Sequence, residues 1–175
     1  PRLNAASRLA HANSAFALLT AATETEAADL AYELNQRNLE RQKITEEIIS
    51  QVEQQIDPNN IPPIIIGLAS EDQAWNEGVI GLVAGRICEK YYRPTLIITR
   101  IIESAVYDPK TNKIIPAKTS FKASGRSIEE FNLIESITAA SEFLDKYGGH
   151  PMACGFSVES EDRLEKFKKK IIEIA

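Results

Sequence analysis

The spacing of hydrophobic positions along the chain changes near residue 57. Between Thr23 and Ile56 apolar side chains recur at helical spacing, and neither glycine nor proline interrupts the pattern. Thr23, with Glu26 three residues later, is a capping-box signature, so we expect a helix to begin there. Both ends of this helix carry apolar stripes, whereas the segment 35–43 has Leu39 as its single apolar residue. This pattern favours a helix that connects two lobes, and the alternative is one long helix within a single bundle.

After residue 58, short apolar runs alternate with stretches of helical periodicity. Strands are predicted at 64–69, 93–99 and 152–160, and helices at 78–92, 129–147 and 161–175. Two further apolar segments flank the turn-rich hexapeptide "DPKTNK" at 108–113, which indicates a hairpin. Strands that alternate with helices predict an α/β fold, and the hairpin makes its sheet mixed and flanked by helices.

Composition and charge narrow the classes of protein. Of the 175 residues, 43% are hydrophobic and 26% charged, as in an ordinary globular protein. No apolar run approaches the roughly 20 residues needed to span a bilayer, so no membrane partner is expected. The net charge of −5 argues against non-specific duplex binding and is compatible with a local phosphate site. Cys88 and Cys154 fall within apolar patterns, which favours buried, reduced thiols and a cytoplasmic protein. Because the chain begins at Pro1 and has no signal-peptide core, we expect an internal start.

Four short stretches contain residue types that packing alone does not require. They are "PRLNAASRL" at 1–9, "WNEGVIG" at 75–81, "ASGRS" at 123–127 and "YGGH" at 147–150. Each stretch also has a structural explanation. Ser127 is a candidate helix cap, Gly148 a candidate helix C-terminus and Trp75 a candidate core residue.

Taken together, these stretches favour a phosphate-ester ligand. A guanidinium binds a phosphate through two parallel hydrogen bonds, and glycine lets backbone N–H groups approach it closely. A loop that precedes a helix adds the dipole of that helix. We therefore expect the "GRS" loop and a "GGH" bend between helix and strand to meet in space, with Arg126 and His150 aimed at one ligand. The candidate binding residues are Asn4, Trp75, Ser124, Gly125, Arg126, Ser127, Gly148, Gly149 and His150, with Arg2 and Arg8 near a second phosphate.

The order of the motifs resembles a known family. "PRLNAASRL", the long helix, "WNEGVIGLVAGRI", "ASGRS" and "GGHPMACGF" are similar to the C-terminal part of the RecJ single-strand-specific exonucleases, within the DHH phosphoesterase superfamily. The resemblance implies a DHHA1-type domain with a mixed sheet, preceded by a long connecting helix. It implies that residues 1–22 are the tail of a catalytic DHH domain, 23–57 the interdomain helix and 58–175 the substrate-binding DHHA1 domain.

The same resemblance implies a function for the parent protein. This would be a metal-dependent exonuclease that degrades single-stranded DNA from 5′ to 3′ in repair and recombination. Its other lobe would hold Mn²⁺ or Mg²⁺, and Arg2 and Arg8 would face the catalytic cleft. A single-strand-binding protein or a helicase is an implied partner. No DHH triplet or aspartate-rich metal motif occurs in these 175 residues, so we expect no metal ligand here and no activity from the chain alone.

Several positions depart from the family pattern, and two other functions stay open. Ser7 replaces the usual glycine, Pro151 and Cys154 differ from the common form, and the hairpin at 101–121 is longer. A DHH oligonucleotidase or cyclic-dinucleotide phosphodiesterase shares the "GGH" signature. An RNA-binding DHHA1 module without enzymatic activity, like the one in alanyl-tRNA synthetases, is the second alternative. The first nine residues and the long helix favour the exonuclease.

Overall fold

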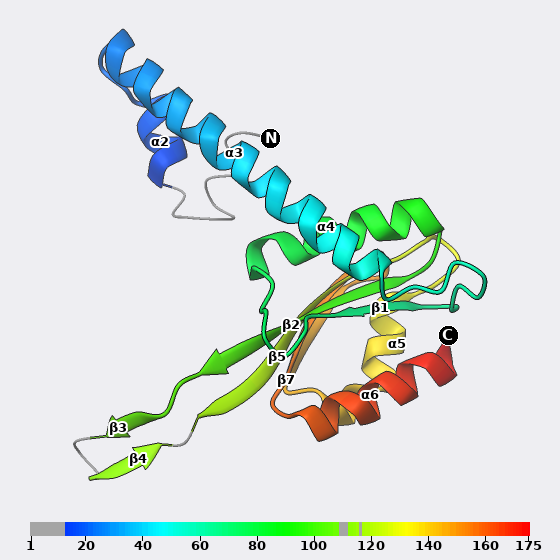
Figure 1. The fold of residues 1–175 in the computed structure, drawn as a ribbon. Helices are drawn as coiled ribbons and strands as arrows, with labels where there is room; N and C mark the ends of the chain where they lie inside the picture. Colours follow the sequence, from blue (N-terminus) through cyan, green and yellow to red (C-terminus); the bar gives the residue numbers. More distant parts are fainter. Residues whose placement is uncertain (1–12, 109–111, 116) are drawn as a thin grey trace. The chain divides into compact units, whose positions relative to one another are not determined.

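The computed structural model of the chain describes residues 13–108, 112–115 and 117–175 (Figure 1). These residues fall into two compact units, with the boundary between Gln51 and Val52. The first unit contains α2 (Asn13–Leu19) and most of α3 (Glu24–Glu53). The second unit contains the sheet and the remaining helices.

The predicted long helix is present as α3, which continues unbroken for 30 residues and ends at Glu53. It begins as the capping box predicts, because Thr23 Oγ1 accepts a hydrogen bond from the Glu26 backbone N–H at 3.2 Å. The Glu26 carboxylate accepts a second hydrogen bond from the Ala22 N–H at 3.0 Å. In the polar centre of the helix, Leu39 is exposed. The role of α3 as an interdomain connection stays a prediction.

The second unit is built on a mixed five-stranded sheet, as predicted. Its strands, in spatial order, are β1 (Ile65–Leu68), β2 (Thr95–Glu103), β5 (Lys118–Arg126), β7 (Ala153–Val158) and β6 (Lys146–His150). The pair β1 and β2 is parallel, and the other three pairs are antiparallel. Gln55 covers the outer edge of β1, because its side-chain amide bonds both the N–H and the C=O of Leu68 at 3.0 Å.

Helices pack on both faces of this sheet (Figure 1). One face forms the main core with α5 (Leu133–Ala139) and α6 (Glu161–Ile174). In that core Phe156 from β7 packs on Phe167 from α6, with ring centroids 4.7 Å apart. On the other face α4 (Glu77–Tyr91) contacts β2 and β5. Among the described residues of the second unit, the helix on this face packs mainly on β2 and β5, and the site described below lies on the same face of β5, β7 and β6.

The helix predicted over 129–147 is wrong in its second half. The structure has the short α5, a single 3-10 turn η1 (Ser141–Phe143), and then strand β6. Arg163 of α6 explains the break, because its guanidinium donates to the carbonyl oxygens of Glu142, Phe143 and Leu144 at 3.0, 3.1 and 3.2 Å. Carbonyls that Arg163 binds need no helical partner, so a tertiary contact overrides the local helical pattern.

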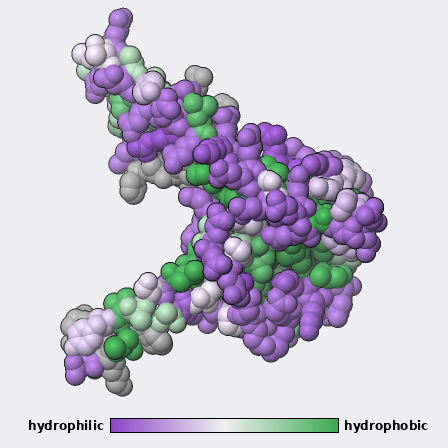
Figure 2. All heavy atoms as spheres, viewed as in Figure 1, coloured by the Kyte–Doolittle hydropathy of each residue, from purple (hydrophilic) through white to green (hydrophobic). Residues whose placement is uncertain are grey.

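The predicted hairpin is present as β3 (Val106–Asp108) and β4 (Lys113–Ile115), which continue outward from β2 and β5. Figure 2 shows hydrophobic side chains along its surface, and Ile102, Val106, Tyr107 and Ile114 are each more than half exposed. Cys88 and Cys154 are free and buried, as predicted. Within the described ranges, no helix is long and apolar enough to cross a membrane.

Candidate functional site

The registers of β5, β7 and β6 place nine side-chain positions on the sheet face toward α4, which we call the open face. Cross-strand partners in an antiparallel sheet point to the same side, so the nine positions form three rows. The rows are Arg126–Ala153–His150, Ser124–Gly155–Gly148 and Lys122–Ser157–Lys146. None of the nine residues is buried. Two of the three rows therefore carry basic side chains at both ends, with small residues between them.

Residues 123–126 of the "ASGRS" stretch lie in strand β5 and not in the predicted loop before a helix, and Ser127 directly follows the strand. Strand alternation divides its residues between the two faces, so Ser124 and Arg126 belong to the open face. A Cβ atom on Gly125 would lie 2.7 Å from Cys154 Sγ and 2.8 Å from Leu133 Cδ2, so that glycine serves packing. The Ser127 hydroxyl is buried and donates to the Phe131 carbonyl at 2.7 Å. Packing therefore explains Gly125 and a hydrogen bond within the chain explains Ser127, and their phosphate role stays a prediction.

Arg126 is a partly buried cation with no carboxylate partner among the described residues. Its Nη1 donates to the Gly125 carbonyl at 2.7 Å. Its Nη2 lies against Gly81 of α4, where a Cβ atom would be 3.4 Å from Nη2 and 3.0 Å from Ser124 Oγ. The other two arginines of the second unit that are not fully exposed are both paired, Arg100 with Glu161 at 2.7 Å and Arg163 with Asp145 at 3.1 Å. A partly desolvated guanidinium without a counter-ion is suited to binding an external anion.

Two buried thiols lie within the electrostatic reach of Arg126. Burial raises the pKa of Cys88, Glu89 raises it further, and Arg126 opposes the shift. Burial raises the pKa of Cys154 from 9.0 to about 11, again against the opposing effect of Arg126. Both thiols stay neutral at pH 7, so neither supplies a negative charge to balance the guanidinium.

The raised pKa of Cys154 predicts an alkaline loss of stability. Below pH 9.0 the thiol is protonated in both states, and between pH 9.0 and about 11 the unfolded chain ionises while the folded chain does not. The free energy of unfolding should fall across that window, by about 1.4 kcal/mol at pH 10. Urea unfolding of the wild type and Cys154→Ala at pH 8 and pH 10 measures this, since the variant lacks the group. Equal losses in the two proteins would contradict the assignment.

The "GGH" stretch forms strand β6 and continues through a turn at Pro151 and Met152 into β7, so the predicted helix-to-strand bend is wrong. The structure requires glycine at only one of its two glycine positions. Gly149 has a φ of +153°, and a Cβ atom there would lie 2.2 Å from the Ala153 carbonyl oxygen. Gly149 is therefore required by the backbone. At Gly148 a Cβ atom would have no neighbour within 4 Å and φ is not positive, so neither packing nor conformation requires glycine there.

The structure brings His150 into the same row as Arg126, on opposite sides of Ala153. Two strand spacings separate their backbones by roughly 10 Å. His150 is exposed, so its imidazole is available to a ligand that lies across this row. The expected meeting of the two stretches is therefore seen in space, although through sheet pairing and not through two loops.

Trp75 does not fit the predicted contact with substrate, because its side chain is only 4% exposed. Its backbone N–H and carbonyl both bond the Thr99 hydroxyl at 2.8 Å, which fixes the segment before α4. The candidates Arg2, Asn4 and Arg8 lie outside the described residues.

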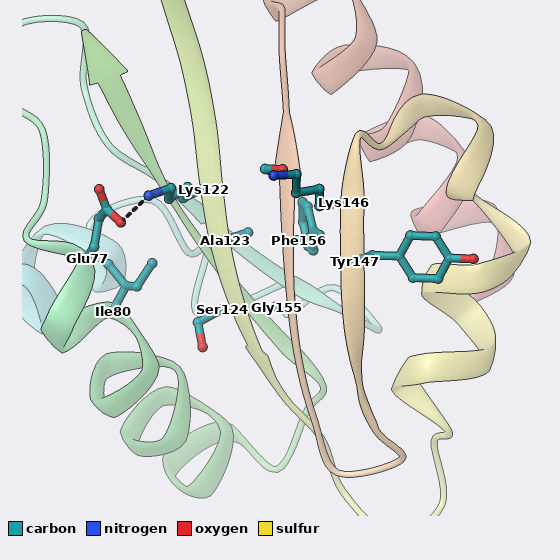
Figure 3. Close-up of a pocket in the computed structure, with 10 residues that line it drawn as sticks. Glu77, Ile80, Lys122, Ala123, Ser124, Lys146, Tyr147, Gly155 and Phe156 are labelled. Atoms are coloured by element: carbon teal, nitrogen blue, oxygen red, sulfur yellow. Dashed lines mark hydrogen bonds and ion pairs between the residues drawn. The ribbon is translucent and has the colours of Figure 1, made fainter. Parts of the chain in front are cut away.

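Sequence reasoning missed Lys122, Lys146 and Ser157, which form the third row of the open face. These residues border a pocket of about 350 Å³ together with Ser124, Gly155 and the α4 residues Glu77 and Ile80 (Figure 3). The missed signal is the polar residue at every second position from Lys118 to Arg126, which is typical of a strand with one solvated face.

The comparison with protein families decides the classification, since residues 62–175 match the DHHA1 domain. The chain belongs to the DHHA1 domain family. It is 37% identical to the single-stranded-DNA-specific exonuclease RecJ of Bacillus subtilis, over all of this chain and 20% of that protein. The crystal structures of RecJ from Thermus thermophilus with Mg²⁺ and with Mn²⁺ each give a TM-score of 0.79 at 30% identity. They cover 99% of this chain and 24% and 23% of theirs.

These matches confirm the resemblance that the motifs predicted, and the mixed sheet with a preceding long helix agrees with the DHHA1 fold. The chain spans about a quarter or less of the length of these relatives. Across the described part of the DHHA1 chain, no three His, Cys, Asp or Glu side chains are grouped so that they could hold a metal ion.

Proposed function

We propose that this chain is the strand-binding part of a longer protein, here called the parent protein, that hydrolyses single-stranded DNA from 5′ to 3′. The observation that carries the proposal is Arg126, a partly buried guanidinium without an ion pair among the described residues, on an open sheet face. Solved relatives that share the fold are named RecJ, and the Bacillus subtilis relative is named a single-stranded-DNA-specific exonuclease.

In this proposal three side chains from the first two rows, Arg126, Ser124 and His150, bind the terminal phosphate of the strand. Arg126 donates to the phosphate oxygens, and the Ser124 hydroxyl, which lies beside it against Gly81, donates a further hydrogen bond. His150 approaches from the other end of the row. Mn²⁺ or Mg²⁺, which the relatives hold, would be bound by the remainder of the parent protein and would activate the attacking water.

The two alternatives make different demands on the same face. The first alternative is an oligonucleotidase, whose short substrates have ends, or a cyclic-dinucleotide phosphodiesterase, whose substrate has no terminal phosphate. The second is an RNA-binding module, which has no hydrolytic partner lobe. The similarity to RecJ extends over the whole chain, including the part before the DHHA1 domain, which favours the exonuclease. A cytoplasmic location and a single-strand-binding protein or helicase as partner stay predictions.

The purified 175-residue chain should be inactive as a nuclease. Phosphodiester hydrolysis of this class requires a metal-bound water, and the described residues offer no metal site. The measurement is the release of nucleotides from 5′-phosphorylated single strands with Mn²⁺ or Mg²⁺, by this chain and by the parent protein. Activity in the parent protein that EDTA abolishes, with none in the chain, is expected. EDTA-sensitive degradation by the purified chain would contradict this division of roles.

A further inference from the structure

The third row of the open face, Lys122–Ser157–Lys146, is not used by the terminal-phosphate site. Along β5, Lys122 lies four residues from Arg126, which corresponds to about 13 Å at the rise of a strand. Side chains stand roughly perpendicular to the sheet, so Lys122 and Arg126 face separate parts of the open face. The third row therefore needs a separate explanation.

The charges in this row are available to an external anion. Lys146 is exposed and has no ion pair among the residues that the structure describes. Lys122 pairs with Glu77 at 2.7 Å, but both side chains are about half exposed, so this ion pair is weak and open to competition. Figure 3 shows the two lysines on either side of the pocket, with Lys146 reaching from β6 over β7.

In the row between the two basic rows, two of the three positions, Gly155 and Gly148, carry no side chain. Gly148 and Gly155 are direct cross-strand partners, and neither needs to be glycine. A Cβ atom on Gly148 would meet nothing within 4 Å, and one on Gly155 would make an ordinary contact of 3.6 Å with the Ala123 carbonyl oxygen. Glycine inside a strand weakens it, and where the backbone does not require it, it often marks the close approach of a ligand.

We propose that Lys122, Lys146 and Ser157 form a second phosphate site, and that a single strand lies over Gly148 and Gly155 between this site and Arg126. The proposal deepens the proposed function and rests on it. The ligand must then carry at least two phosphates separated by about the distance between the first and third rows, which is roughly 13 Å. A polynucleotide strand meets this condition, and a mononucleotide does not.

The test compares two ligands in the parent protein, with EDTA present so that nothing is hydrolysed. One ligand is a 5′-phosphorylated mononucleotide, and the other is a 5′-phosphorylated single-stranded oligonucleotide. Lys146→Ala should weaken oligonucleotide binding about two- to fivefold, leave mononucleotide binding unchanged, and lower the salt slope by about 0.7. Gly148→Ala should weaken oligonucleotide binding without lowering the unfolding midpoint, because its added Cβ atom covers the backbone there and meets no atom within 4 Å.

Lys169→Ala is the matched control, because this exposed lysine lies on α6, which packs against the opposite face of the sheet. It should change neither ligand's affinity. Arg126→Ala distinguishes the terminal-phosphate site from the second phosphate site, since it should weaken the binding of both ligands. If Arg126→Ala weakens the binding of both ligands and Lys146→Ala weakens the binding of neither, the proposed second site is wrong and the terminal-phosphate site stands. If Arg126→Ala also has no effect, the proposed function fails.

Discussion

Gly149→Ala is expected to lower the free energy of unfolding by about 2–4 kcal/mol. The backbone at Gly149 has a φ of +153°, which L side chains rarely adopt. The added Cβ atom would lie 2.2 Å from the Ala153 carbonyl oxygen and 2.6 Å from Cys154 Cα, and both are backbone atoms that cannot rotate away. The hairpin of β6 and β7 must therefore shift or open. Urea unfolding of the purified chain measures the loss.

Gly148→Ala, one residue earlier, is the control. No atom lies within 4 Å of its Cβ position and its φ is not positive, so stability should be unchanged or raised by about 0.4–1 kcal/mol. Equal losses for the two variants would contradict the distinction between a glycine that the backbone requires and one that it does not.

Arg126→Ala in the parent protein is expected to weaken the binding of 5′-phosphorylated single strands by about 1.5–3 kcal/mol, which corresponds to roughly 10- to 150-fold. The variant removes a charge-assisted contact from a partly buried position without leaving a carboxylate unpaired, since none pairs with Arg126 among the described residues. The salt dependence of binding should also flatten, because one phosphate is no longer neutralised. Fluorescence anisotropy over a series of salt concentrations measures both quantities.

Arg86→Ala controls for the loss of one positive charge. Arg86 is exposed on α4 and has no ion pair among the described residues. It should leave the affinity nearly unchanged. A loss in Arg86→Ala as large as that in Arg126→Ala would show that net charge, and not the open face, governs binding.

Local signals were sufficient for most of the fold. The capping box at Thr23 and Glu26, the absence of glycine and proline up to Ile56, and the alternation of strands and helices after residue 58 each depend on neighbouring residues. The structure agrees with them in α3, in α4 and in the mixed sheet. The order β1-β2-β5-β7-β6 could not be predicted from residues alone, because the alternation does not specify which strands pair.

The failures in the fold occur where a distant contact decides the local structure. The apolar spacing over 129–147 is helical. However, Arg163 donates to three carbonyls of that segment, and the residues that follow pair with β7 as strand β6. Nothing within the segment signals either contact. The sequence predicts a bend at "GGH" for the same reason, since glycine is as compatible with a turn as with a strand that needs an unusual φ at Gly149.

Part of the candidate site could be predicted from the sequence. The alternation of side chains along each strand between the two faces of the sheet explains which part. Arg126, Ser124, Gly148 and His150 belong to the open face, whereas Gly125, Ser127 and Trp75 serve packing. A motif written as consecutive letters selects neighbours, but a strand presents every second residue to one face. Register, which the sequence does not reveal, brought Lys122 and Lys146 into the site.

The measurement that tests the central claim most directly is a double-mutant cycle between Arg126 and the terminal phosphate. The parent protein and its Arg126→Ala variant are each titrated with one oligonucleotide that carries either a 5′-phosphate or a 5′-hydroxyl group. If Arg126 binds the terminal phosphate, the wild type should prefer the phosphorylated strand and the variant should lose most of that preference, while Arg86→Ala keeps it. A variant that binds more weakly but keeps the full preference for the 5′-phosphate would contradict the account.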